Sequence, residues 1–423
     1  MGRSYIVEDD VEGYLSKLCS QPAGPVTGLL IGQSTVQRDF VVMATRTPQN
    51  DESGDGGKSV DKEWVSEHAR QASRMLPGGL SVLGVFIISE SDAKDTLTTL
   101  RQLVFSAENL ISSERLWTPA DDDVTDCVTL HVNPKTRKTV CRTFDVKDPK
   151  SVAKPADWKY QSGVCSSWAT VSCCLSVDLM VPLPENFTRN MDDCLKEELK
   201  VWAQQIERGV CLIDGKKPPE DSELKAGQKK NVRQTISVQL LITPDVQTAA
   251  DVVQPCGGCV SVRGAIHSRA FLHSNKPKAK LAEKLLKRDI VSTVATRVQM
   301  LLEEPQTQNE KNKTEQFCLP RRVFCPVKST GPLSVCDYQF SDEGLSEMTD
   351  RFKEMLDMDA AEEDLDATQE MIAEVIKSEV TKEESAEENE MLDPWRNNYI
   401  GVAMATAVAL LALAASIVYL SDV

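Results

Sequence analysis

Apolar residues repeat along the chain with two different spacings, which predicts a mixture of helices and strands. Helical spacing predicts helices at residues 11–18, 61–75, 92–110, 191–206 and 280–302. Short apolar or alternating runs predict strands at residues 26–33, 39–44, 81–89, 127–133, 139–144, 170–180, 236–242 and 259–266. Residues 317–340 are expected to be a last packed segment. The pattern favours an α/β or α+β fold with mixed sheets and no internal repeat.

Composition divides the chain into four expected parts. Residues 1–210 are expected to form an α/β core, and residues 211–340 a second part of the globular body that includes the long helix. Residues 341–398 are strongly acidic and are expected to form a helical spacer next to a membrane. Residues 399–420 are expected to form a transmembrane tail anchor.

The predicted anchor carries no charged residue from Tyr399 to Leu420. A helix of roughly 22 residues that rises about 1.5 Å per residue spans the ~30 Å hydrocarbon layer. Because only Ser421, Asp422 and Val423 follow, we expect insertion after synthesis, with the body in the cytosol. The moderately apolar tail without a basic cluster after it favours the membrane of the endoplasmic reticulum. The anchor residues singled out are Tyr399, Gly401, Ala405, Ala409, Leu411, Leu413 and Tyr419.

Three of these anchor residues, Gly401, Ala405 and Ala409, are spaced four apart. A face of small residues lets a second helix approach closely, although an alanine-rich tail also produces this spacing by chance. The sequence leaves both interpretations open.

Two faces of apolar residues interrupt the acidic segment. The first face holds Leu345, Met348, Phe352, Met355 and Leu356, and the second holds Met371, Ile372, Val375 and Ile376. Asp366 with Gln369 resembles a capping box for the second helix. The faces predict either helices that dock a partner or a charged spacer that holds the body away from an anionic membrane.

Charge and cysteine usage restrict the class of protein. The formal net charge of −16, with pI ≈ 4.9, argues against nonspecific binding to nucleic acid, which needs a basic footprint. Thirteen cysteines without regular spacing indicate reduced thiols in a cytosolic protein. The sequons at Asn186 and Asn312 are therefore interpreted as chance matches.

One short segment combines four potential zinc ligands: Cys256, Cys259, His267 and His273. The residues between Cys259 and His267 alternate as a strand, which would carry the histidines away from the thiols, so we expect no zinc. Residues 163–168 contain Cys165, a possible nucleophile, but their small side chains are typical of a turn that leads into the next strand. The chain has no GxxxxGK[ST], GxGxxG or GxSxG motif, so neither a catalytic site nor a cofactor is expected.

Several segments together carry a resemblance to a known family. They are residues 27–32, residues 80–86, the turn at residues 257–260 with Arg263-Gly264, residues 320–324 and the apolar end. In this order, over essentially the whole chain, they resemble the family of odorant-response-abnormal protein 4. The resemblance implies an adaptor at the endoplasmic reticulum that promotes maturation and export of G-protein-coupled receptors. It also implies docking of the protease specific for the ubiquitin-fold modifier.

The two early strands also resemble the core of an MPN domain, the fold of zinc deubiquitinases. In that pattern a glycine-led strand ends in a metal-binding His-x-His pair, whereas Gly84 is followed here by Ile87 and Ser89 at the metal positions. The resemblance thus implies a metal-free member that binds rather than cleaves. The alternatives are a membrane-tethered cysteine isopeptidase and a purely structural tether.

Overall fold

The computed structural model describes residues 2–20, 24–49, 60–183, 191–213, 215–224, 235–242, 256–274, 276–303, 314–328 and 330–371. All of them belong to one unit, Met1–Val375. Among these residues no helix is long and apolar enough to cross a membrane. The predicted anchor at residues 399–420 lies outside the described part of the chain.

The first half of the unit is an eight-stranded mixed sheet with the strand order β7-β6-β5-β4-β2-β3-β1-β8. Its strands are β1 (Ser4–Glu8), β2 (Val26–Gln33), β3 (Asp39–Arg46), β4 (Ser81–Ile88), β5 (Asp126–Val132), β6 (Thr139–Asp145), β7 (Lys154–Pro155) and β8 (Asp157–Gln161). Strand β1 runs parallel to β3 and β8, β4 runs parallel to β5, and the other pairs are antiparallel. The helices of this half are α1 (Asp9–Leu18), α2 (Lys62–Arg74) and α3 (Ala93–Ser113).

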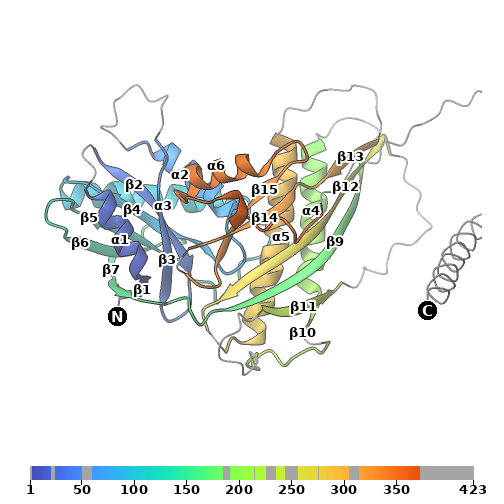
Figure 1. Cartoon of the computed structure of the whole chain (residues 1–423), viewed down its shortest axis with the longest axis horizontal. Helices are drawn as coiled ribbons and strands as arrows, with labels where there is room; N and C mark the ends of the chain where they lie inside the picture. Colours follow the sequence, from blue (N-terminus) through green and yellow to red (C-terminus); the bar gives the residue numbers. More distant parts are fainter. Residues whose placement is uncertain are drawn as a thin grey trace, which may run out of the picture. The chain divides into compact units, whose positions relative to one another are not determined.

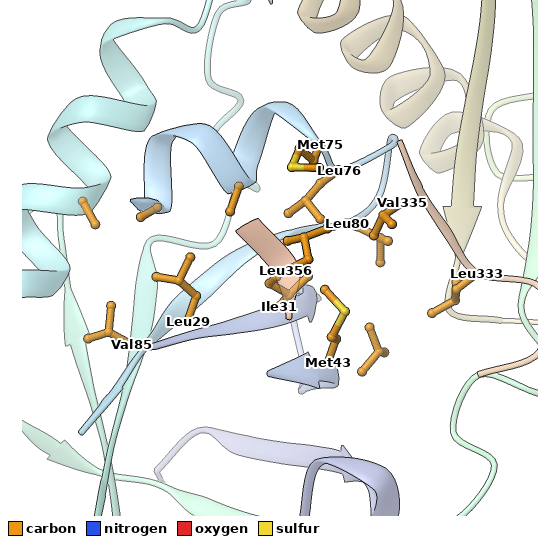
Figure 2. Close-up of a cluster of buried hydrophobic side chains, with 14 of the residues drawn as sticks. Leu29, Ile31, Met43, Met75, Leu76, Leu80, Val85, Leu333, Val335 and Leu356 are labelled. Atoms are coloured by element: carbon orange, nitrogen blue, oxygen red, sulfur yellow. The ribbon is translucent and has the colours of Figure 1, made fainter. Parts of the chain in front are cut away.

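Strand β2 is apolar on both sides because it lies inside the sheet, between β4 and β3. Side chains alternate across a strand, so Leu29 and Ile31 enter one core while Leu30 enters the opposite one. Figure 2 shows Leu29 and Ile31 beside Met43 and Val85 in the first core. A strand buried on both faces explains why Leu29, Leu30 and Ile31 form a continuous apolar run instead of alternating with polar residues.

The second half of the unit is a five-stranded sheet with the order β10-β11-β9-β12-β13. Its strands are β9 (Ala169–Leu183), β10 (Val210–Ile213), β11 (Thr235–Leu241), β12 (Gly258–Leu272) and β13 (Thr314–Cys318). Strands β9 and β12 pair antiparallel over their whole lengths. Helices α4 (Met191–Arg208) and α5 (Ala279–Glu303) lie along these two long strands (Figure 1).

The two helices cover only one face of the five-stranded sheet. Along β9, Val177 and Val181 are buried against them, while Asp178 and Met180 on the other face are exposed. The alternation that predicted this strand therefore reflects a sheet with one covered face.

A hairpin and a helix complete the unit. Strands β14 (Arg321–Pro326) and β15 (Ser334–Gln339) pair antiparallel, and α6 (Leu345–Leu356) and the short helix η1 (Glu362–Asp364) follow. Side chains of β14, β15 and α6 join the first core, and Figure 2 shows Leu356 next to Ile31 and Val335 near Leu80. The last described segment of the unit therefore packs back onto its first sheet.

The mixed-sheet α/β fold predicted from the sequence is confirmed, but the structure divides the chain differently from the expected parts. The second sheet begins at Ala169, within the expected first domain of residues 1–210. Residues 341–371, expected to begin the spacer, are part of the globular unit. The sheet to which β9 belongs is set by the strand that it pairs with. That strand is β12, which lies far away in sequence, so the sequence pattern of β9 alone does not show its sheet.

The contact between α2 and α6 predicts a loss of stability in acid. His68 on α2 is buried, its Nε2 lies 2.8 Å from the Met355 carbonyl oxygen, and burial lowers its pKa below the ordinary 6.5. The unfolded chain therefore takes up the proton first, so the stabilising contribution is present above pH 6.5 and is lost as the pH falls through the lowered pKa.

Urea unfolding at about pH 7.5 and about pH 5.5 measures this loss. We expect His68→Gln, which keeps a neutral N–H donor toward Met355, to show a smaller acid loss than the wild type. An equal loss in both proteins would show that His68 does not contribute to it.

Candidate functional site

The position that resembles the metal site of an MPN domain lacks metal ligands. Ile87 is buried in the first core, and the Ser89 hydroxyl lies 3.4 Å from His131 Nε2. An aliphatic side chain offers no electron pair to a metal. Across the described residues, no group of three or more His, Cys, Asp or Glu side chains gathers around a common point.

The four residues considered for zinc are spread along β12 and beyond it. Cys259 and His267 lie eight positions apart on this strand, which at about 3.3 Å per residue separates them by roughly 26 Å. His273 stacks on Phe40 at 5.4 Å between ring centroids and contacts Gln33. Cys256 is exposed. The structure thus does not bring these side chains together.

A cysteine and a histidine do meet elsewhere, in a pair that the sequence did not predict. Cys174 on β9 lies opposite His267 on β12, with 3.1 Å between Sγ and Nδ1. The two residues are far apart in sequence, and only the strand register brings them together. The pair is the best candidate for nucleophilic chemistry in the described part of the chain.

The surroundings of this pair do not activate the thiol. Burial raises the pKa of the Cys174 thiol and lowers the pKa of the His267 imidazole. Both groups are therefore neutral at pH 7, whereas a nucleophilic cysteine needs a thiolate, usually beside a charged histidine or a helix N-terminus. The turn that holds Cys165 is structural too, since its Gly163 and Val164 N–H groups donate to the Glu8 carboxylate.

The two sheets are joined by a polar cluster around Asp289 of α5. Its carboxylate accepts hydrogen bonds from the Gly78 N–H at 2.8 Å, from Ser268 Oγ at 2.7 Å and from both Nη atoms of Arg322 at 2.7 and 2.9 Å. Gly78 also exchanges backbone hydrogen bonds with β12. The Pro77-Gly78-Gly79 turn that ends α2 is thus also the contact between the two sheets.

A glycine is required at position 78 of this contact. A Cβ atom there would lie 2.8 Å from the Ala270 Cβ and 2.8 Å from the Leu285 carbonyl oxygen. Both distances are shorter than normal van der Waals contact, so any larger residue would push the sheets apart.

A second ion pair fixes the end of the described chain to the same place. The Glu370 carboxylate accepts two hydrogen bonds from Arg297 at 2.8 Å each, one from the His267 N–H at 2.6 Å and one from the Arg322 N–H at 2.7 Å. The Arg297 and Glu370 side chains are 0% and 1% exposed. Glu370 thereby connects β12, β14 and α5.

The structure places the expected docking residues in two different environments. Met348 and Phe352 are fully buried in the first core, and Leu345 and Met355 pack against it. This first apolar face is covered by the chain's own body, which corrects the expectation that it docks a partner.

Met371, on the second face, is 84% exposed. Its companions Ile372 and Val375 lie outside the described residues, as do the anchor residues Tyr399, Gly401, Ala405, Ala409, Leu411, Leu413 and Tyr419. Asp366, expected to cap a helix, instead pairs through its backbone with Phe324 of β14.

Comparison with known proteins agrees with the resemblance in the sequence. Residues 28–367 match the family model described as odorant response abnormal 4-like. The chain belongs to this family. It is 42% identical to "Protein odr-4 homolog" of Mus musculus over 450 residues and 40% identical to that of Homo sapiens over 456 residues, in each case with 100% of both chains covered.

The names of these odr-4 relatives do not mention a catalytic activity. Among solved structures, the family member is similar to the crystal structure of UfSP from C. elegans, with 9% identity, a TM-score of 0.45, and coverage of 84% of this chain and 57% of that one. A likeness at this level is too low to support an inference about function.

Proposed function

We propose that this odr-4 family member is a noncatalytic adaptor at the membrane of the endoplasmic reticulum. In this role it promotes the maturation and trafficking of G-protein-coupled receptors and docks the protease specific for the ubiquitin-fold modifier. The body faces the cytosol and residues 399–420 anchor it. The observation that carries the proposal is the full-length similarity to the odr-4 homologs, whose family name refers to an odorant response.

Two features support binding rather than catalysis. The MPN-like metal positions hold Ile87 and Ser89, and the Cys174–His267 pair lacks the charge that a nucleophilic thiol needs. The apolar, uncharged run at residues 399–420 supports anchoring.

Deleting residues 399–423 tests the adaptor role. We expect the shortened chain to fold and to keep its protease partner, but to release that partner from membranes into the cytosol and to lose receptor export. Tethering raises the local concentration of a bound partner near membrane substrates without changing the docking contacts. Membrane fractionation, co-purification and receptor surface staining in cells without their own copy measure the three results.

The matched control replaces residues 399–420 with an unrelated apolar anchor of equal length. This chimera should restore both membrane location and export. Export by the shortened chain, or loss of the partner from it, would show that the adaptor-plus-anchor proposal is wrong. If the chimera reaches the membrane but does not export receptors, the native helix itself takes part in binding.

The Cys174–His267 distance favours one second candidate, a cysteine isopeptidase. Release of the modifier from a conjugate by the purified chain, abolished by Cys174→Ser, would establish this activity. Retained receptor export by Cys174→Ser, with no release by the wild type, is the result expected of an adaptor.

A further inference from the structure

A long groove lies beside α5, between this helix and the end of the eight-stranded sheet where β4 begins. Its volume is about 1240 Å³. Helix α5 lines it from Leu281 to Leu302, a length of roughly 32 Å at about 1.5 Å per residue. Pockets for small molecules measure about 300–1,000 Å³. The groove matches instead about ten residues of extended polypeptide, at about 3.3 Å each.

The groove concentrates positive charge in an acidic protein. Ten lysines and arginines but only six aspartates and glutamates line it, although the whole chain has a net charge of −16. Lys284 forms ion pairs with Asp122 and Asp123, and Arg288 forms an ion pair with Asp123.

Four other lining cations have no acidic partner among the described residues. They are exposed and comprise Arg38, Lys147, Lys196 and Lys200. Lys196 and Lys200 lie one turn apart on α4, so they present two ammonium groups on the same side of the helix. These cations are available to carboxylates of a bound molecule.

One buried residue of the lining keeps an unpaired donor. Arg322 lines the groove and is 1% exposed, and its two Nη atoms bind Asp289. Its Nε has no hydrogen-bond partner. A buried N–H without an acceptor is unfavourable. The Arg322 guanidinium also lies beside the buried Cys336 thiol.

Apolar side chains form much of the remaining lining. They include the nearly buried Leu80, the half-buried Trp117 and Leu281, and Val36, which is 75% exposed. Side chains of an extended segment alternate in direction, so one set can contact these apolar residues while the other reaches the lysines.

We propose that this groove binds an extended segment of a partner protein in which acidic residues alternate with apolar ones. The inference rests on the proposed adaptor role and identifies the groove as a surface through which the adaptor binds a partner. A membrane surface fits the same lysines less well, because they line a groove between α4, α5 and the sheet rather than a flat face.

Fluorescence anisotropy with a labelled ten-residue peptide of alternating glutamate and leucine tests the proposal on the full-length chain in mild detergent. We expect saturable binding that weakens as salt rises from about 50 mM to about 300 mM, because salt screens exposed charges. A matched peptide with lysine in place of glutamate should bind at least about tenfold more weakly.

The double variant K196E/K200E should also bind the acidic peptide at least about tenfold more weakly than the wild type. The control K154E/K159E makes the same change in net charge at exposed lysines of β7 and β8, outside the groove, and should bind within about twofold of the wild type. Thermal unfolding of both variants checks that they remain folded.

Equal binding of the two peptides, or wild-type affinity of K196E/K200E, would overturn the proposal. Binding of phosphatidylserine vesicles without binding of the peptide would also overturn it, in favour of a membrane surface. Self-association of the chain that K196E/K200E abolishes, again without binding of the peptide, would overturn it in favour of a second copy of the chain. If the peptide fails but the protease still co-purifies with the chain, only the groove is wrong and the adaptor role stands.

Discussion

Replacing Glu370 with alanine will lower the free energy of unfolding by about 3–5 kcal/mol, because it leaves the Arg297 guanidinium buried without its counter-charge. The substitution also removes the acceptor from the His267 and Arg322 N–H groups. Urea unfolding followed by circular dichroism measures the change. Folded proteins keep only a small margin of stability, so this variant should unfold at a clearly lower temperature than the wild type.

Two controls distinguish the effect of breaking the buried Arg297–Glu370 pair from the effect of removing any negative charge in this segment. The exposed Glu363, in the same part of the chain, should change stability by no more than about 0.5 kcal/mol when it is replaced with alanine. The double variant R297M/E370L replaces both charges with apolar groups and should be more stable than E370A. Wild-type stability of E370A would show that Glu370 does not enter the core in solution.

Replacing Phe352 with alanine should lower the free energy of unfolding by about 3–5 kcal/mol, the usual cost of truncating a buried aromatic side chain. Phe352 is fully buried in the first core, where α6 meets the first sheet and α2. Truncation leaves a cavity, since the surrounding side chains collapse only in part. Urea unfolding of the two proteins under the same conditions gives the difference.

Met371 supplies the matched control, because it is apolar, lies in the same acidic region and is 84% exposed. Met371→Ala should stay within about 0.5 kcal/mol of the wild type. Unchanged stability of Phe352→Ala together with loss of a bound protein would restore the interpretation of α6 as a docking helix.

Glu370 and Phe352 both lie in the acidic segment that the sequence assigned to a spacer. A docked end at residue 371 leaves residues 372–398 between the globular unit and the predicted anchor. At about 3.3–3.6 Å per residue these residues span at most roughly 90–100 Å. Under the proposed anchoring, residue 371 could therefore lie no farther than that distance from residue 399.

The sequence alone determined the type of most elements. The apolar run of β2 and the polar Asp61 at the start of α2 are local signals, because a strand or helix is recognised from its own residue spacing and its end residues. The mixed-sheet fold class followed from the order of these elements. The family followed from the order of short segments along the whole chain.

The short strand β1 was missed, although Tyr5 and Val7 are fully buried. Its five residues are too few to show a periodic pattern. Only its pairing with β3 and β8 identifies it as a strand, and this pairing is visible in the structure but not in the sequence. The same applies to β9, which the sequence recognised as a strand but placed in the wrong part of the molecule.

Tertiary structure alone decided where the polar groups meet. The Cys174–His267 pair, the Asp289–Arg322 pair and the Arg297–Glu370 pair each join residues from distant parts of the chain. An apolar face on a helix indicates that the face is buried, but not which part of the protein or which partner buries it. The apolar face of α6 packs against the first core. An acidic side chain is exposed by default, and Glu370 is buried because Arg297 and two backbone N–H groups replace the water it loses.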